Sequence, residues 1–389
     1  MAEFKLFPKP EYTPPPFREL FSDRAKGKID YILLVTVCAL ILFGVLMVYS
    51  ASYYAAEKNY GDAFFYVKKQ AVGVVLGAFA LFAAARLNYR VWEKLRYPAL
   101  VVSFVLLVMV FIPGIGLENY GAKRWIDLPG FTVQPSEIAK FGFVIFAASY
   151  MARYPDRMTK FTGMLPVLGT GALMALLIIL EPNMSITVCL LLVMLIMLFL
   201  GGTRIKHFFI LMIPMAALIP ILIIIEPYRL NRLLAFVNPW ASPQGEGFQL
   251  VQSLYALGSG GLFGVGLFNS RQKYLFLPFS ESDFIFSVIG EELGLFGALI
   301  VIAAYCIIIW RCVRAAAAAP DRFGCYLSAG VAAVIAVQTM VNIAVVTGSI
   351  PPTGLPLPFI SAGSSSLVVF MFAIGMVLNV SARCNFTRH

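Results

Sequence analysis

The sequence predicts an all-α integral membrane protein, because its composition is apolar, its apolar runs are long and a strand pattern is missing. Of its 389 residues, 60% are hydrophobic and only 13% are charged, whereas a soluble domain carries about 25% charged residues. Many apolar runs reach the roughly 20 residues that a spanning helix needs. The alternating segments of about 10 residues that mark a membrane β-barrel are not seen.

Ten apolar segments are predicted to cross the membrane, and they form a single polytopic domain over residues 31–380. The segments are 31–53, 67–85, 98–112, 136–151, 163–180, 184–200, 205–225, 284–310, 325–346 and 359–380. Residues 1–30 are polar and rich in proline, which predicts a flexible tail rather than a cleaved signal. Residues 381–389 form a second, short tail.

The distribution of Lys and Arg orients these spans. If the N-terminal tail is cytoplasmic, 20 of the 30 basic residues fall inside, 9 fall outside and 1 lies within a span. Cytoplasmic loops of membrane proteins carry such an excess of basic residues. We therefore expect both termini in the cytoplasm. Nucleic acid is not expected as a partner, because the chain has no basic stripe with interleaved aromatics.

The longest external segment, residues 226–283, connects the seventh and eighth spans and is rich in glycine and aromatic residues. A long ordered loop is more often functional than a mere connection. Residues 248–257 within it are predicted to form an amphipathic helix at the membrane interface. The inverted repeat found in many transporters is not evident, and the six cysteines suggest neither a disulfide framework nor a metal site.

Ionisable residues at the edge of apolar spans are energetically expensive, which makes them functional candidates. Lys123 and Arg124 lie in a predicted external loop, where the planar fork of Arg can bind a phosphate. Glu137 and Lys140 follow, three residues apart on one predicted helix face. They could form a structural ion pair, or Lys140 could join the cationic patch that binds the phosphate.

Two further groups flank the long external loop. Arg229 and Arg232 lie outside, either as snorkelling interfacial side chains or as contacts to an anionic headgroup or pyrophosphate. Asp283 lies where the loop meets the eighth span, where desolvation would raise the pKa of its carboxyl group and suit it to general-base work. The alternative is a helix N-cap, a position that Asp favours. Glu291 and Glu292 are expected to be buried pairing residues.

The last candidate segment, residues 350–366, combines prolines with small polar residues at the external ends of two spans. Non-helical backbone at membrane depth persists only where it is buried in protein or lines a cavity. The hydroxyl groups of Thr353, Ser361, Ser364 and Ser365 could therefore bind sugar or phosphate in a polar cleft. Close helix packing through small residues is the alternative.

These clusters, in this order, resemble the SEDS family of cell-wall polymerases, which includes FtsW, RodA and SpoVE. The resemblance extends over nearly the whole chain, from residue 30 to residue 379. The matching stretches are 47–52, 124–127, 134–137, 226–229, 238–240, 247–253, 283–286 and 290–294. Residues 60–62 and 258–266 resemble FtsW and SpoVE more than RodA.

The resemblance implies polymerisation of lipid II into glycan strands at the outer face of the bacterial cytoplasmic membrane, for cell division or sporulation. The family's essential loop aspartate falls on Asp283, which would act as the base that deprotonates the GlcNAc 4-hydroxyl of the acceptor. Lys123, Arg124 and Arg229 would stabilise the departing undecaprenyl pyrophosphate.

Further substrate-binding candidates are Gln249, Gln252 and Lys273, which lie in the long external loop. The sequence requires no cofactor and offers no dedicated metal ligands, although Mg²⁺ or Mn²⁺ could assist. The partners that the resemblance implies are lipid II, the undecaprenyl-pyrophosphate-linked glycan, a class B penicillin-binding transpeptidase, divisome proteins and membrane lipids.

The sequence departs from the family pattern at two places. The usual Pro-Asp-Leu-Gly-Thr reads Pro-Asn-Met-Ser-Ile at residues 182–186, and Ala362 follows Ser361 where the family has Tyr. Two alternative functions are a flippase for lipid-linked precursor and a non-catalytic scaffold that activates a penicillin-binding protein. A flippase needs substrate access from the cytoplasmic side, whereas the candidate charges gather outside.

Overall fold

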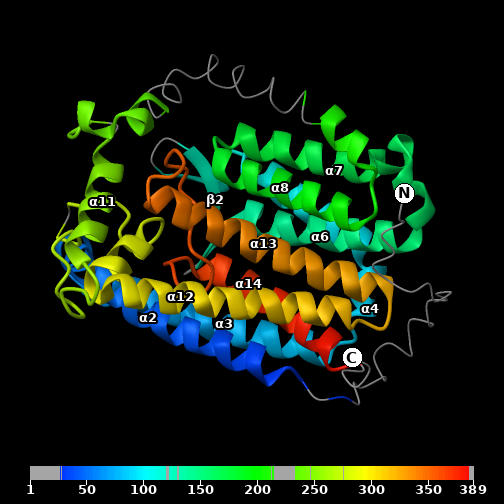
Figure 1. The fold of residues 1–389 in the computed structure, drawn as a ribbon, viewed down its shortest axis with the longest axis horizontal. Coiled ribbons are helices and arrows are strands. Elements are labelled where there is room, and N and C mark those ends of the chain that lie inside the picture. Colours follow the sequence, from blue (N-terminus) through cyan, green and yellow to red (C-terminus); the bar gives the residue numbers. More distant parts are fainter. Residues whose placement is uncertain are drawn as a thin grey trace.

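Long helices run side by side along the molecule in the computed structural model, and a small sheet lies at one end (Figure 1). The structure describes residues 27, 29–119, 122–128, 131–211, 213, 233–245, 247–274 and 276–384. Its α-helices are α2 (Tyr31–Tyr60), α3 (Phe65–Arg86), α4 (Arg90–Lys94), α5 (Arg96–Met109), α6 (Pro135–Arg153), α7 (Phe161–Leu180), α8 (Met184–Leu200), α11 (Phe248–Gly260), α12 (Ile285–Ala317), α13 (Arg322–Val346) and α14 (Ser364–Ser381). The 3₁₀ helices are η1 (Pro155–Thr159) and η2 (Pro239–Ala241), and the strands are β1 (Gly116–Asn119), β2 (Ala122–Leu128) and β3 (Phe131–Val133).

The apolar helices confirm a membrane protein. Among the described residues, α2, α3, α7, α12, α13 and α14 are each long and apolar enough to cross a membrane, and α5 and α8 are shorter apolar helices. Nine of the ten predicted spans coincide with helices in the described part of the chain. The tenth, 205–225, lies mostly outside the described residues, as do most of the two predicted tails, so the count of ten stays a prediction.

Capping residues explain where several helices begin and end. The side chain of Asp30 accepts a hydrogen bond from Leu33 N (3.1 Å) and thereby caps α2, and the side chain of Asp321 accepts one from Gly324 N (2.8 Å) and caps α13. Gly61 ends α2 in the left-handed region, with φ 67°. Asp30, which the sequence assigned to the tail, is thus part of the folded domain.

The sheet between α5 and α6 corrects the all-α expectation in detail. Strands β1, β2 and β3 pair antiparallel in that order, with Gly116 opposite Ile126 and Ile126 opposite Val133. Within β2 the polar Lys123 and Asp127 are exposed, whereas Ile126 is buried. The strands are too short to give a clear alternating pattern in the sequence.

Helices α3 and α14 pack closely through small residues. Gly73 and Gly77 are four residues apart on α3, and a Cβ at Gly73 would come within 2.9 Å of Ser364 on α14. Small residues at this spacing let two helix backbones approach in a membrane, where packing rather than hydrophobic burial holds helices together.

The two ends of the bundle carry different elements (Figure 1). One end carries α4, η1, the α12–α13 turn and the C-terminal end of α14, and we call it the basic end because Arg and Lys are frequent there. The opposite end carries β1–β3, α11 and the segments 269–284 and 347–363, and we call it the loop end. The helix predicted over residues 248–257 is confirmed there as α11, whereas its place at the membrane interface stays a prediction.

Candidate functional site

Asp283 lies at the loop end, in the last turn before α12, and its side chain is half-buried. The chain reaches this position through a tight turn in which Ser282 N and Phe284 N both donate to the carbonyl of Phe279, at 3.1 and 3.3 Å. Phe279 itself has a φ of 57°, a backbone conformation that L-residues rarely adopt. The turn fixes the direction in which the Asp283 side chain leaves the backbone.

Two other elements hold the backbone of this turn. Asn342 of α13 donates from Nδ2 to the carbonyl of Asp283 (2.8 Å) and to that of Leu355 (2.6 Å). Ser361 donates from Oγ to the carbonyl of Ser282 (2.6 Å), and Ala362 N donates to the carbonyl of Glu281 (2.8 Å). The segment 281–283 is thus joined to the segment 355–362.

The carboxylate of Asp283 lies directly against Gly354. A Cβ placed on Gly354, whose φ is +69°, would be 2.9 Å from Oδ2 of Asp283. The N-cap interpretation of Asp283 is wrong, because α12 begins at Ile285 with Phe284 as its N-cap and without a side-chain capping bond. The carboxylate is therefore not used to start the helix.

Arg124 fastens the sheet to the turn between α7 and α8. It lies on β2 and donates to the carbonyl of Glu181 (3.4 Å) and to that of Pro182. These carbonyls follow the C-terminal end of α7, where the helix dipole attracts a cation. Lys123, the preceding residue of β2, is exposed and lies opposite Glu118 in the β1–β2 register.

Glu137 and Lys140 form the ion pair that their spacing predicted. Lys140 Nζ lies 3.0 Å from Glu137 Oε1, and neither side chain has any exposed surface. Lys140 also donates to Gln338 of α13, and Ser366 of α14 donates to Glu137 Oε2 at 3.1 Å. The pair ties α6, α13 and α14 together, so this geometry favours the structural interpretation of Lys140 over phosphate binding.

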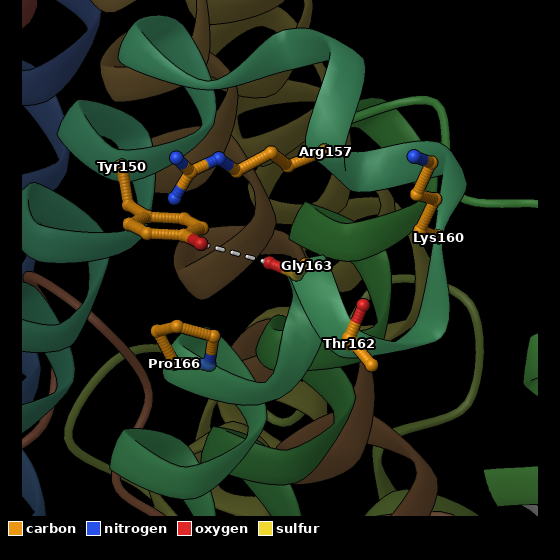
Figure 2. A pocket seen from close by; sticks show the side chains of 6 residues that line it. All are labelled: Tyr150, Arg157, Lys160, Thr162, Gly163 and Pro166. Carbon is orange, nitrogen blue, oxygen red and sulfur yellow. Dashed lines mark hydrogen bonds between the residues drawn. The ribbon is translucent and has the colours of Figure 1, made fainter.

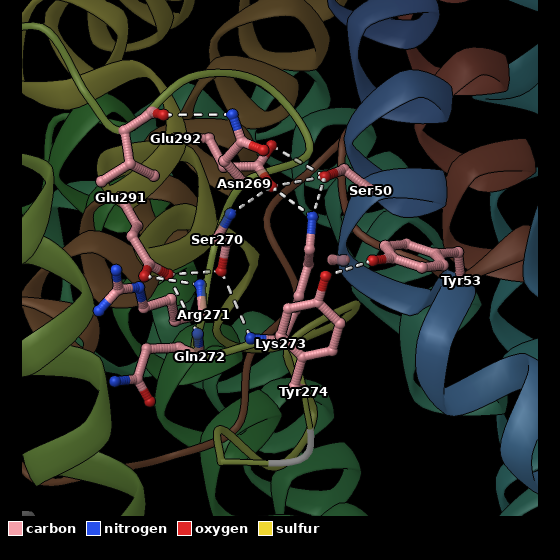
Figure 3. Close-up of polar contacts among 12 residues, drawn as sticks. Ser50, Tyr53, Asn269, Ser270, Arg271, Gln272, Lys273, Tyr274, Glu291 and Glu292 are labelled. Carbon is pink, nitrogen blue, oxygen red and sulfur yellow. Dashed lines mark hydrogen bonds and ion pairs between the residues drawn. The ribbon is translucent and has the colours of Figure 1, made fainter.

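Lys273 is also buried, although the sequence suggested a substrate contact. Its Nζ lies 2.9 Å from Glu292 Oε1, and both side chains are fully buried (Figure 3). Ser50 of α2 donates to the same carboxylate, at 2.6 Å. The expectation that Glu292 is a buried pairing residue is confirmed.

Glu291 holds the same loop from the other side. Its carboxylate accepts hydrogen bonds from Ser270 Oγ and from the backbone N–H groups of Arg271 (2.9 Å) and Gln272 (3.4 Å) (Figure 3). Two adjacent glutamates of α12 therefore fix the segment 270–273, which leads into the turn at Asp283.

The remaining predicted substrate-binding residues differ in their surroundings. Ser361 and Ser365 serve backbone groups, since Ser361 Oγ accepts from Leu357 N (2.7 Å) and Ser365 Oγ accepts from Gln134 N (3.3 Å). Thr353 Oγ1 is buried and has no hydrogen-bond partner among the described residues, and Ser364 packs against Gly73. Gln249 and Gln252 are half-buried on α11, while Arg229 and Arg232 lie outside the described residues.

Comparison with known proteins decides the family. Residues 31–385 match the family model FtsW/RodA/SpoVE, which is described as "Cell cycle protein". The chain belongs to the FtsW/RodA/SpoVE family. Stage V sporulation protein E of Bacillus subtilis is 39% identical over 358 residues, which cover 92% of this chain and 98% of that protein. The "Probable peptidoglycan glycosyltransferase FtsW" of Trichlorobacter lovleyi is 43% identical over 359 residues, covering 92% and 94%.

Solved structures of similar proteins share the fold of this FtsW/RodA/SpoVE member. A chain in "Structural coordination of polymerization and crosslinking by a peptidoglycan synthase complex" matches with a TM-score of 0.74 and 27% identity, over 91% of this chain and 97% of that one. An aspartate-to-alanine variant of the rod shape determining protein RodA from Thermus thermophilus matches with a TM-score of 0.66 and 25% identity, over 91% and 97%.

Three residues that the sequence analysis missed shape the site of this family member. Gln70 of α3 is buried and donates to the carbonyl of Ser361 (3.2 Å) while it accepts from Gly363 N (3.2 Å). Asn342 holds Asp283, and Glu181 is buried beside Arg124. A polar residue within a predicted span was the available signal for Gln70 and Asn342.

The departure from the family pattern at Asn183 has a local structural role. The side chain of Asn183 accepts a hydrogen bond from Ile186 N (3.4 Å) and caps α8. Asn and Asp cap helices about equally well. The neutral residue therefore preserves the start of α8 in this member of the FtsW/RodA/SpoVE family.

Proposed function

We propose that this chain is a peptidoglycan glycosyltransferase that polymerises lipid II. The observation that carries the proposal is the placement of Asp283: its backbone is held by Asn342, and its half-buried carboxylate lies against Gly354 at the loop end. Relatives that share about two-fifths of its residues bear the name "Probable peptidoglycan glycosyltransferase FtsW", and the family resemblance assigns the essential loop aspartate to Asp283.

In the proposed reaction Asp283 acts as the general base. Its carboxylate accepts the proton of the GlcNAc 4-hydroxyl of lipid II, and this oxygen forms a bond to the anomeric carbon of the donor glycan. The bond between that carbon and the pyrophosphate oxygen breaks, so undecaprenyl pyrophosphate leaves with the bonding electron pair. A positioned base contributes about 10²–10⁴ in rate.

Cations of the loop end would stabilise the negative charge that develops on the pyrophosphate. Lys123 is exposed on β2 beside Arg124, whose place is fixed by the carbonyls after α7. Lys140 and Lys273 have their charges neutralised by buried glutamates, so we assign them to structure and not to substrate.

The orientation follows from the charges. Because basic residues concentrate on the cytoplasmic side of membrane proteins, we place the basic end in the cytoplasm and the loop end outside, in the bacterial cytoplasmic membrane. Asp283 then meets lipid II after the precursor has crossed the membrane. A fixed base on the outer side fits polymerisation better than it fits a flippase.

The described residues of the protein offer few ligands for a divalent cation in the absence of substrate. Within the described residues no three His, Cys, Asp or Glu side chains come together as a metal site. Mg²⁺ is commonly held by one or two carboxylates together with substrate phosphates. We therefore expect Mg²⁺ or Mn²⁺, where it assists, to bind with the substrate.

A transpeptidase partner is part of the proposal. A similar structure is described as a peptidoglycan synthase complex that coordinates polymerization and crosslinking. We infer that this chain works beside a class B penicillin-binding protein, with divisome proteins if its role is in division. Its resemblance to both FtsW and SpoVE supports a role in septum synthesis.

The test is lipid II polymerisation by the purified chain with its transpeptidase. Asp283→Asn keeps the size of the side chain but removes the base, and we expect polymer formation to fall at least about 100-fold. Asp62→Asn is the matched control, because Asp62 is an acidic residue of the same end that pairs with the exposed Lys68 (2.7 Å), and it should retain activity.

Three results would contradict the proposal. Equal polymer yield from Asp283→Asn and the wild type would remove Asp283 as the base. Translocation of lipid II headgroups in liposomes without any polymer would favour the flippase. The scaffold would be favoured if the partner alone made the polymer and cells that depend on this protein grew normally with Asp283→Asn.

A further inference from the structure

A pocket of about 370 Å³ opens at the basic end between α6 and α7, far from Asp283 along the bundle. It is lined by Tyr150, Arg157, Lys160, Thr162, Gly163 and Pro166 (Figure 2). Its volume lies within the roughly 300–1,000 Å³ of small-molecule sites. Tyr150 closes one wall by donating from its hydroxyl to the carbonyl of Gly163 (3.0 Å).

The two cations of this pocket differ from their neighbours in charge pairing. At the same end Arg90 pairs with Asp321 (2.9 Å), Arg153 with Glu93 (3.7 Å) and Arg311 with Asp30 (2.7 Å). In the described part of the chain neither Arg157 nor Lys160 has a carboxylate within ion-pair distance. The adjacent Asp156 does not line the pocket. The pocket therefore carries two positive charges without an acidic partner.

Aromatic and apolar residues place the pocket at the level of lipid headgroups. Tyr154 and Phe161 flank it and are 36% and 37% exposed, and Leu165, one turn further along α7, is 48% exposed. Exposed Tyr97 and Trp310 lie at the same end. The cationic pocket thus borders an exposed apolar surface with aromatic residues, the combination typical of the membrane–water interface.

The geometry points to an anionic phospholipid as the occupant, with its phosphate headgroup on Arg157 and Lys160 and its acyl chains along Phe161 and Leu165. Arg and Lys attract anionic lipid headgroups, and basic pockets between spanning helices bind them. Thr162 offers a hydroxyl group on the pocket wall, whereas the proton of the Tyr150 phenol is already donated to Gly163. The leaflet is the cytoplasmic one, which rests on the orientation proposed above.

Native mass spectrometry of the purified full chain tests this proposal. The protein is exchanged into an equimolar mixture of phosphatidylglycerol and phosphatidylcholine, and the retained lipids are counted. The wild type should retain phosphatidylglycerol in preference. Arg157→Gln/Lys160→Gln should bind it about 30-fold more weakly, because each basic residue near an anionic lipid contributes a factor of about five.

The matched control is Arg204→Gln/Lys206→Gln, which removes two exposed cations from the same end but outside the pocket. It should retain phosphatidylglycerol like the wild type, and so should Arg157→Lys, which keeps the charge. Equal loss in the control, equal retention by the pocket variant, or no preference over phosphatidylcholine would overturn the proposal. So would displacement of the lipid by excess inorganic phosphate, which would indicate a site for a soluble anion.

Lipid retention is measured without lipid II. The result is therefore independent of the polymerase assay, and a failure here leaves the assignment of Asp283 untouched.

Discussion

Glu181 shows how one buried residue can make the stability of the protein depend on pH. Its side chain is 1% exposed, and neither carboxylate oxygen has a hydrogen-bond partner among the described residues. Burial raises the pKa of Glu181 from 4.5 to about 8, although the nearby charge of Arg124 lowers it. The folded protein therefore keeps Glu181 protonated at a pH where the unfolded chain has released that proton.

We expect Glu181→Gln to become more stable relative to the wild type as the pH rises. The contribution of Glu181 is fully present below its unfolded pKa of 4.5 and is lost as the pH rises through about 8. Glutamine keeps the size of the side chain and cannot ionise. The measurement is the thermal unfolding temperature of both proteins in detergent across this range.

Asp62→Asn serves as the control for this prediction. The hydrogen bond from Lys68 lowers the pKa of the Asp62 carboxyl group. The contribution of Asp62 to stability is therefore lost only as the pH falls below the range over which Glu181 titrates. A difference between Glu181→Gln and the wild type that stays constant with pH would contradict the account of Glu181.

At the residue scale, the sequence could place charged residues but not choose their partners. The Glu137–Lys140 pair follows from helical spacing alone, because both partners lie on one turn. Lys273 and Glu292 are 19 residues apart, and nothing local indicates that they meet. Asp283 was identified by the family resemblance, whereas its contact with Gly354 depends on how two separate loops pack.

At the scale of elements, the segment 269–284 is held to the helices by a buried ion pair. Lys273 contacts Glu292 of α12 and also donates to Ser50 of α2 (3.3 Å), and Ser280 donates to the carbonyl of Ala51 on the same helix (3.2 Å). These bonds fix the loop at two points, ten and three residues before Asp283. We infer that Lys273 and Glu292 are positioning residues for the site.

Breaking this pair from one side should be worse than replacing both partners. Lys273→Met leaves the Glu292 carboxylate buried without its cation, which costs about 3–5 kcal/mol, whereas a buried pair replaced by hydrophobic residues of similar volume often costs nothing. Glu292→Gln removes the uncompensated charge that Lys273→Met alone leaves. We therefore expect Lys273→Met/Glu292→Gln to unfold at a higher temperature than Lys273→Met alone.

The polymerisation assay separates positioning from stability in the same variants. If the double variant recovers the unfolding temperature but not the rate, the pair positions the loop before Asp283. Lys94→Met removes a lysine at the basic end, away from Asp283, and is the control for the polymerisation rate. Equal unfolding temperatures for the single and double variants would contradict the role of the buried charge.

Elements were predicted where one physical rule dominates. Apolar runs of spanning length gave α2, α3, α12, α13 and α14, because a bilayer requires long helices. The sheet β1–β3 was missed because it is short and follows an apolar run. The kink of α12 at Gly294, with φ 67°, was missed because it depends on the close approach of residues 262–264.

At the scale of the whole molecule, charge asymmetry predicts how the bundle sits in the membrane. Arg86, Arg157, Lys206, Arg314 and Arg322 all lie at the basic end. At the loop end Lys140 and Lys273 are neutralised by buried glutamates. Ion pairs occur at both ends, but the basic end carries more Arg and Lys, and this excess favours a cytoplasmic basic end.

Cysteine labelling in intact cells tests this orientation. Lys58 is exposed at the end of α2, on the loop end, and Lys206 is exposed on the basic end. In a chain whose six native cysteines are replaced, we expect Lys58→Cys to react with a membrane-impermeant maleimide added from outside. Lys206→Cys should react only after the cells are permeabilised.

The reversed pattern would place Asp283 in the cytoplasm, where an acceptor on the outer surface could not reach it. Because the side chains at positions 58 and 206 are both exposed, a difference in labelling reports the side of the membrane and not a difference in accessibility within the fold. Labelling of both positions before permeabilisation would indicate that the cells are broken. A cytoplasmic marker protein, which should stay unlabelled in intact cells, checks this. Orientation and catalysis are thereby joined, since a base at the loop end can serve the outer surface only if the basic end faces the cytoplasm.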